Sequence, residues 1–146
     1  MKKKIAILGS TGSIGKTLID IIKKDYNNFE ITLLTANKNY KELIKQAKFF
    51  KVKNLIIQDE MAFNILSRDK YCKKINIYKN FNELKKIFNK KIDYSMSAIT
   101  GIDGLKPTLE IIKYSKNIAI ANKEAIICGW NLLNSELKKN KTNFIP

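Results

Sequence analysis

Short apolar segments rich in β-branched residues alternate along this chain with longer segments whose apolar residues recur at helical spacing. The pattern predicts strands at residues 4–8, 29–36, 54–58, 75–78, 92–99 and 117–121, and the start of another at 143–145. It predicts helices at residues 13–24, 40–51, 60–67, 82–89, 105–114 and 123–139. Such alternation is typical of βαβ units joined by right-handed crossovers. We therefore expect an α/β fold, a doubly wound parallel sheet with helices on both faces.

The organisation of the chain is simple. No internal repeat, low-complexity linker or proline-rich boundary divides its 146 residues, so we expect one domain over residues 1–146. A chain that is 45% hydrophobic has enough apolar residues for a globular core. In the first predicted helix, one face carries Ile14, Leu18, Ile21 and Ile22, and we expect that face to pack on the sheet.

The net charge of +15 changes this picture little. Of the 28 basic residues only Arg68 is an arginine, and the lysines are scattered without a dense block. Nucleic-acid-binding proteins usually rely on arginine for bidentate contacts, so we expect no nucleic-acid partner, although a basic binding module stays open as an alternative. Without a signal peptide or an apolar run of about 18 residues, we expect a soluble, cytoplasmic protein with no membrane partner.

Cysteine and histidine usage excludes several kinds of chemistry. The chain has no histidine, and its two cysteines, Cys72 and Cys128, lie far apart in sequence. Ser-His-Asp triads, Cys-His nucleophiles and Cys/His zinc sites are therefore excluded. We expect two reduced structural thiols, no metal site and no catalytic residue within these residues.

The first predicted strand leads directly into a glycine-rich turn. Gly9, Gly12 and Gly15 recur every third residue and open the first helix, which is a variant of the Rossmann dinucleotide fingerprint. Such a turn needs one glycine for a positive φ, one so that a pyrophosphate can approach the backbone, and one for close helix packing. The helix N-terminus attracts the phosphates, and the hydroxyls of Thr11 and Ser13 can donate to them.

The same residues also resemble part of a phosphate-binding P-loop. Gly15, Lys16 and Thr17 match the end of that motif, and residues 55–60 resemble the strand that accompanies it. The motif requires its first glycine at position 10, where this chain has Ser10. A P-loop nucleotide hydrolase therefore stays open only as an alternative.

The end of the second strand bears on the choice of cofactor. NAD-binding domains usually carry an acidic residue there, which holds the ribose hydroxyls. Here Ala36 is followed by Asn37, Lys38 and Asn39, with no acid and one lysine. Because a lysine attracts a 2′-phosphate, the sequence favours NADP(H) over NAD(H).

Two later strand ends also carry chemistry, because ligands of open α/β sheets bind beyond the carboxyl ends of the strands. Residues 96–101 are mostly small and would let a flat ring approach. The second segment is Asn122, Lys123 and Glu124. Asn122 suits a helix N-cap as well as a ligand contact, whereas Lys123 opposes the helix dipole and therefore hints at function.

The glycine-rich turn, residues 36–39 and the segment Ala121-Asn122-Lys123-Glu124-Ala125, in this order and at these separations, resemble the 1-deoxy-D-xylulose 5-phosphate reductoisomerase family. The resemblance covers all 146 residues and implies the N-terminal NADPH-binding domain of that enzyme. Two positions depart from the family pattern: Asn37, where glycine is frequent, and Trp130, where small residues are common.

The resemblance also implies roles for individual residues. Those near the NADPH pyrophosphate would be Thr11, Gly12, Ser13 and Ile14. Those around the adenosine ribose and its 2′-phosphate would be Asn37, Lys38 and Asn39. Asn122 and Glu124 would contact the nicotinamide half, with residues 97–99 beside the ring. Lys123 would reach the sugar phosphate substrate.

The reaction that the resemblance implies is an isomerisation of 1-deoxy-D-xylulose 5-phosphate followed by hydride transfer from NADPH, which yields 2-C-methyl-D-erythritol 4-phosphate. In that family a homodimeric enzyme uses a divalent metal (Mg or Mn) whose acidic ligands follow the strand that starts at residue 143. We therefore expect a truncated chain without the metal-binding and C-terminal parts, which binds NADPH but does not catalyse the overall reaction alone.

Overall fold

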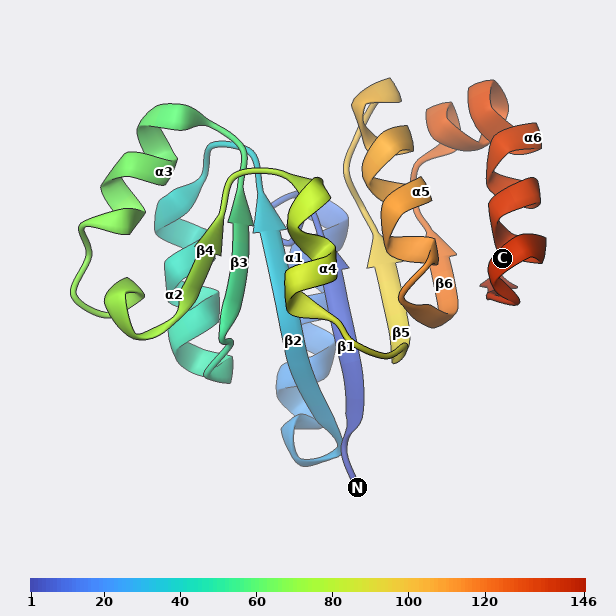
Figure 1. Cartoon of the computed structure of the whole chain (residues 1–146). Coiled ribbons are helices and arrows are strands. Elements are labelled where there is room, and N and C mark those ends of the chain that lie inside the picture. Colours follow the sequence, from blue (N-terminus) through green and yellow to red (C-terminus); the bar gives the residue numbers. More distant parts are fainter.

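The computed structural model describes all residues, 1–146, and contains one seven-stranded parallel sheet (Figure 1). Its strands are β1 (Lys3–Leu8), β2 (Phe29–Ala36), β3 (Asn54–Ile57), β4 (Asn76–Tyr78), β5 (Ile92–Ser97), β6 (Ser115–Ile120) and β7 (Asn143–Ile145). They lie in the order β4-β3-β2-β1-β5-β6-β7, so the chain builds outward from β1 in one direction and then in the other. The predicted parallel α/β sheet is confirmed.

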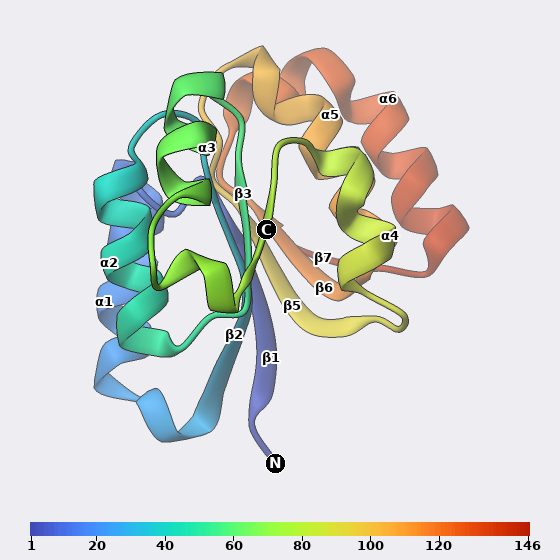
Figure 2. The same cartoon turned by 60° about the vertical axis from the view of Figure 1, so that its left-hand side comes forward.

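Helices cover the sheet on both faces, as Figure 2 shows. The helices are α1 (Ser13–Lys24), α2 (Tyr40–Phe50), α3 (Glu60–Ser67), α4 (Leu84–Ile87), α5 (Leu105–Ile112) and α6 (Lys123–Asn140). Successive residues of β1 point to opposite faces of the sheet and therefore belong to two separate hydrophobic cores. Ile5 and Ile7 pack with α1, α2 and α3, whereas Ala6 and Leu8 pack with α4, α5 and α6. A doubly wound sheet has this division of helices.

The predicted buried face of α1 is partly wrong. Ile14 and Ile21 are 44% and 57% exposed, and the buried stripe is Gly15, Ile19 and Ile22. The two stripes lie side by side on the helix, and both fit helical spacing. The stripe that contains Gly15 packs on the sheet. Because Gly15 has no side chain, α1 can approach the backbone of the preceding turn closely only on this side.

The helix predicted at residues 82–89 is shorter than expected. A 3₁₀ turn at Phe81–Glu83 precedes α4, which covers only Leu84–Ile87. Phe88 already has extended backbone, with φ −116° and ψ 124°. Phe81, Leu84 and Phe88 are all buried. Their helix-like spacing therefore arises because all three contact the core, and not because they share one long helix.

Candidate functional site

The site lies at the carboxyl end of the sheet, where the strand order changes direction. β1 pairs with β2 on one side and with β5 on the other, and chain growth reverses between these two neighbours. In doubly wound folds the crevice beyond this switch point receives the ligand. The turns after β1, β2, β3, β5 and β6 all lie at this end.

The first turn, residues 9–15, is called the glycine loop below, and its three glycines meet different surroundings. Gly9 has a φ of +76°, and a Cβ there would lie 2.8 Å from the Ala98 carbonyl oxygen. A Cβ at Gly15 would overlap the Gly9 carbonyl oxygen and the Ser10 backbone. At Gly12 it would meet only the Gly9 oxygen, at 3.6 Å. Gly9 and Gly15 are therefore required by the fold, whereas Gly12 is exposed and open to a ligand.

Helix α1 begins without a side-chain cap. Its N-cap is Gly12, whereas Asn39, Asp59 and Asn122 cap α2, α3 and α6 through their side-chain oxygens. The N–H groups of the first turn of α1 therefore have no partner from a cap, and they carry the positive end of the helix dipole. Neither Thr11 nor Ser13 uses its hydroxyl in a hydrogen bond within the protein. This arrangement suits an anion.

Two connected clefts follow the glycine loop along the carboxyl end of the sheet. The narrower, of about 150 Å³, lies between the glycine loop and the turns after β2, β3 and β5. The wider, of about 680 Å³, extends from there over the turn before α4 and the start of α5. Both are lined by Asn37, Gln58, Ile99 and Thr100. Together they form one elongated depression, which suits an extended ligand such as a dinucleotide.

Comparisons with known proteins agree with this geometry. The sequence model of the 1-deoxy-D-xylulose 5-phosphate reductoisomerase family matches residues 5–129. The chain belongs to this family. The reductoisomerase of Pelagibacter ubique is 62% identical over 99% of this chain and 38% of its own length, and that of Caldanaerobacter subterraneus is 38% identical over 99% and 37%. The chain thus spans less than half of the curated reductoisomerases it matches.

Solved structures of reductoisomerases have the same fold. The Zymomonas mobilis enzyme in complex with NADPH matches with a TM-score of 0.89 at 30% identity, covering 100% of this chain and 38% of that one. A reductoisomerase with NADPH, fosmidomycin and magnesium matches with a TM-score of 0.88 at 28% identity, covering 99% and 36%. Staphylococcus aureus homoserine dehydrogenase, at 19% identity and a TM-score of 0.55, shares only the fold.

In this reductoisomerase-family chain the P-loop alternative does not fit. The turn from β1 into α1 comprises only residues 9–12, because the helix begins at Ser13. Gly15 and Lys16 therefore lie inside α1, and Ser10 is completely buried. A P-loop needs a longer loop that wraps around the phosphate before the helix begins.

Residues 11–14 and 37–39 lie at adjoining turns of the site. Thr11, Gly12 and Asn37 line the narrow cleft together, while Ser13 and Ile14 are exposed on the first turn of α1. Lys38 is exposed and forms no ion pair with a carboxylate. The Asn39 side chain accepts a hydrogen bond from the Glu42 backbone N–H at 3.2 Å and so caps α2.

Residues 122–124 lie at the start of α6. Asn122 is 2% exposed, and its Nδ2 donates to the carbonyl oxygens of Ile99 and Gly101, both at 2.5 Å. Its Oδ1 accepts from the Ala125 N–H at 3.1 Å, so the side chain is the N-cap of α6 and also holds the turn after β5. Lys123 and Glu124 are exposed on the first turn and line neither cleft.

Some site residues differ from the sequence-based expectation. Among residues 97–99, only Ala98 and Ile99 line a cleft, because the Ser97 hydroxyl is buried against that of Thr108 at 2.6 Å. Gln58 and Thr100 line both clefts; Thr100 lies in the segment 96–101 that the sequence indicated, whereas Gln58 was not expected at the cofactor site. Gln58 directly follows the end of β3, so that position alone could have identified it.

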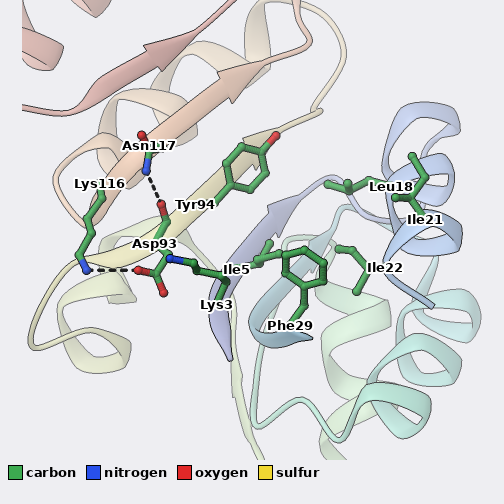
Figure 3. Close-up of a pocket in the computed structure, with 10 residues that line it drawn as sticks. All are labelled: Lys3, Ile5, Leu18, Ile21, Ile22, Phe29, Asp93, Tyr94, Lys116 and Asn117. Atoms are coloured by element: carbon green, nitrogen blue, oxygen red, sulfur yellow. Dashed lines mark hydrogen bonds and ion pairs between the residues drawn. The ribbon is translucent and has the colours of Figure 1, made fainter. Parts of the chain in front are cut away.

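A largely apolar cleft lies at the opposite, amino end of the sheet (Figure 3). It has a volume of about 540 Å³, and six of its ten lining residues are hydrophobic. Asp93 lies at its polar rim, where it accepts from the Lys4 N–H at 2.8 Å and pairs with Lys116 at 3.2 Å. The Lys4 hydrogen bond and then the Lys116 bond lower the pKa of this carboxyl below its ordinary value.

Residues 1–146 contain neither a metal-binding cluster of side chains nor a membrane-spanning helix. No three histidine, cysteine, aspartate or glutamate side chains lie close enough together to hold a metal ion. No helix combines the length and apolarity needed to cross a membrane.

Proposed function

We propose that this chain is the NADPH-binding part of a 1-deoxy-D-xylulose 5-phosphate reductoisomerase, the enzyme of isoprenoid synthesis that rearranges and reduces this sugar phosphate to 2-C-methyl-D-erythritol 4-phosphate. The observation that carries the proposal is the glycine loop at the switch point, with Gly12 open and α1 uncapped. Family membership and the NADPH-bound Zymomonas relative support it.

The residues of the site divide the binding of NADPH between them. The first-turn N–H groups of α1 and the hydroxyls of Thr11 and Ser13 bind the pyrophosphate, and Ile14 continues this contact. Lys38, which has no carboxylate partner, binds the 2′-phosphate, with Asn37 and Asn39 beside it. Ile99 faces the nicotinamide half, where Asn122 acts by fixing the turn after β5 and Glu124 approaches from α6. Bound NADPH supplies the hydride.

The remaining parts of the activity belong to the longer enzyme. Lys123, exposed at the start of α6, contacts the sugar phosphate. The divalent metal is held by the part of the reductoisomerases that this chain does not span, and the complete enzyme is a cytoplasmic homodimer. Residues 1–146 alone therefore bind the cofactor without turning over the substrate.

Calorimetric titration of the 146-residue protein with NADPH, NADH and Mg-ATP tests the proposal. We expect saturable NADPH binding at least tenfold tighter than NADH binding, because only NADPH carries the 2′-phosphate that Lys38 attracts. Binding of Mg-ATP alone, or of nucleic acid with steep salt dependence and without NADPH binding, would contradict it.

A further inference from the structure

We infer that Gln46 is a positioning residue of the cofactor site: its carboxamide holds the Ser10 backbone inward, so that the following residues of the glycine loop, Thr11 and Gly12, line the narrow cleft. The inference rests on the proposed function, because it assumes that the glycine loop receives a pyrophosphate. Gln46 lies in the second turn of α2 and touches neither cleft.

Ser10 is anchored from two sides. It is completely buried, and its N–H donates to the Thr35 carbonyl oxygen at 2.9 Å. The Ser10 carbonyl oxygen accepts from Nε2 of Gln46 at 3.0 Å. Thr35 also accepts the Gly9 N–H through its Oγ1 at 3.0 Å. The end of β2 and the helix α2 thus fix the glycine loop at the residue before Thr11, where the open part begins.

The same helix begins at the turn proposed to bind the 2′-phosphate. Asn39 caps α2 through the Glu42 N–H, and a carboxylate oxygen of Glu42 accepts from Nε2 of Gln46 at 3.4 Å. A continuous series of contacts therefore runs from Asn39 through Glu42 and Gln46 to Ser10. Helix α2 therefore fixes the positions of both the turn after β2, which is proposed to bind the 2′-phosphate, and the glycine loop, which is proposed to bind the pyrophosphate.

The burial of Gln46 lowers the stability of the fold, because one polar atom of its side chain is left without a hydrogen-bond partner. The residue is 3% exposed, and its Oε1 is the one buried side-chain nitrogen or oxygen without a hydrogen-bond partner. A buried acceptor left unpaired lowers stability, and an apolar side chain of similar volume would avoid this loss. A polar group kept at such a loss is expected where function requires it, here as the donor to Ser10.

The substitution Gln46→Met separates positioning from stability. It removes the unpaired Oε1 but leaves the Ser10 carbonyl oxygen unpaired instead, so one buried unpaired acceptor replaces another and the melting temperature should shift by less than about 4 °C. The freed carbonyl is satisfied only by water or by a shift of the loop. The loop then loses its orientation while the fold persists.

The affinities for two ligands show whether the substitution affects the glycine loop or the turn after β2. NADPH needs the glycine loop, whereas adenosine 2′-monophosphate carries no pyrophosphate and uses only the turn after β2. By NMR titration we expect Gln46→Met to weaken NADPH binding at least tenfold and adenosine 2′-monophosphate binding less than twofold. Asn64→Met, the same change of an amide at an exposed position of α3, should alter neither. Unchanged NADPH affinity, or equal loss of both ligands, would overturn the inference.

A cofactor-free measurement keeps the inference separate from the proposed function. In the ligand-free protein, Gln46→Met should speed hydrogen exchange of the Ser10 and Gly12 amides, which donate to Thr35 and Gly9, and Asn64→Met should not. If the wild-type protein fails to bind NADPH, the proposed function fails while this measurement still decides the role of Gln46. Should Gln46→Met not fold, Thr35→Val releases the loop from the opposite side and must give the same ligand selectivity.

Discussion

The two ends of the sheet differ in how their polar groups are used. At the amino end, charged groups pair within the protein: Asp93 accepts from Lys4 and Lys116, and Lys91 donates to the Asn140 carbonyl oxygen at the end of α6. At the carboxyl end Lys79 pairs with Glu60 at 3.2 Å, but α1 has no side-chain cap and Lys38 has no carboxylate partner. The uncapped helix beside the glycine loop, rather than the apolar cleft at the amino end, therefore marks the site proposed to bind the nucleotide.

The glycines give the strongest test of this contrast. Gly15→Ala should destabilise the fold by about 3 kcal/mol, because its Cβ overlaps the Gly9 carbonyl oxygen and only backbone movement relieves this. Gly12→Ala, with its nearest neighbour at 3.6 Å, should cost less than about 1 kcal/mol. Both should weaken NADPH binding at least tenfold. Urea denaturation and calorimetry measure the two effects, and normal NADPH binding by Gly12→Ala would contradict the proposed role of the loop.

The sequence predicted the glycine loop well because the constraints on that turn are local. A positive φ at Gly9, an open position at Gly12 and close packing at Gly15 all follow from the glycine spacing between a strand and a helix. The order of strands and helices is likewise fixed by periodicity and by the handedness of crossovers. These features require no knowledge of how distant segments meet.

Lys38 should have the next largest effect. Its ammonium is proposed to bind the 2′-phosphate, and a hydrogen bond to a charged group contributes about 1.5–3 kcal/mol. Lys38→Ala should therefore weaken NADPH binding about 10- to 100-fold and leave NADH binding nearly unchanged. Lys3→Ala, at the cleft of the amino end, is the control and should alter neither. Equal loss of both cofactors in Lys38→Ala would show that the lysine does not recognise the 2′-phosphate.

The sequence could not predict contacts that depend on the tertiary arrangement. Gln46 and Ser10 lie 36 residues apart, and no local pattern indicates that α2 will bring them together. The face of α1 was predicted only in part: Ile22 is buried as expected, but Ile14 and Ile21 are exposed, because the close approach of Gly15 to Gly9 fixes which side of the helix faces the sheet. Asn122 suited a cap from sequence, but its bonds to Ile99 and Gly101 required the fold.

Cys72 tests whether the amino end serves stability. It lies before β4, and burial, with the nearby Asp69 carboxylate, raises the pKa of its thiol from 9.0 to about 11. Between these values the unfolded chain loses the proton and the folded chain keeps it, so stability is complete below pH 9 and falls as the pH rises towards 11. The loss attributable to this thiol should be on the order of 2 kcal/mol.

Urea denaturation at pH 8, 9, 10 and 11 measures this loss as the difference between wild type and Cys72→Ala. The comparison cancels lysine titration, which is common to both proteins. Cys128→Ala, at an exposed thiol, should follow the wild-type curve. NADPH binding at pH 8 should be the same in all three proteins. A Cys72→Ala curve parallel to that of the wild type would show that the thiol does not stabilise the folded state through its protonation.

The smallest effect should come from Lys51, which ends α2 at the amino end with a φ of 55°. A lysine in the left-handed region is strained, so Lys51→Gly should stabilise the protein by about 0.5–1 kcal/mol. Lys45→Gly, at an exposed position inside the same helix, should destabilise it by about 1 kcal/mol. Thermal unfolding distinguishes the opposite signs. Because neither residue belongs to the site, NADPH affinity should stay constant, and a change with Lys51→Gly would mean that the two ends of the sheet are coupled.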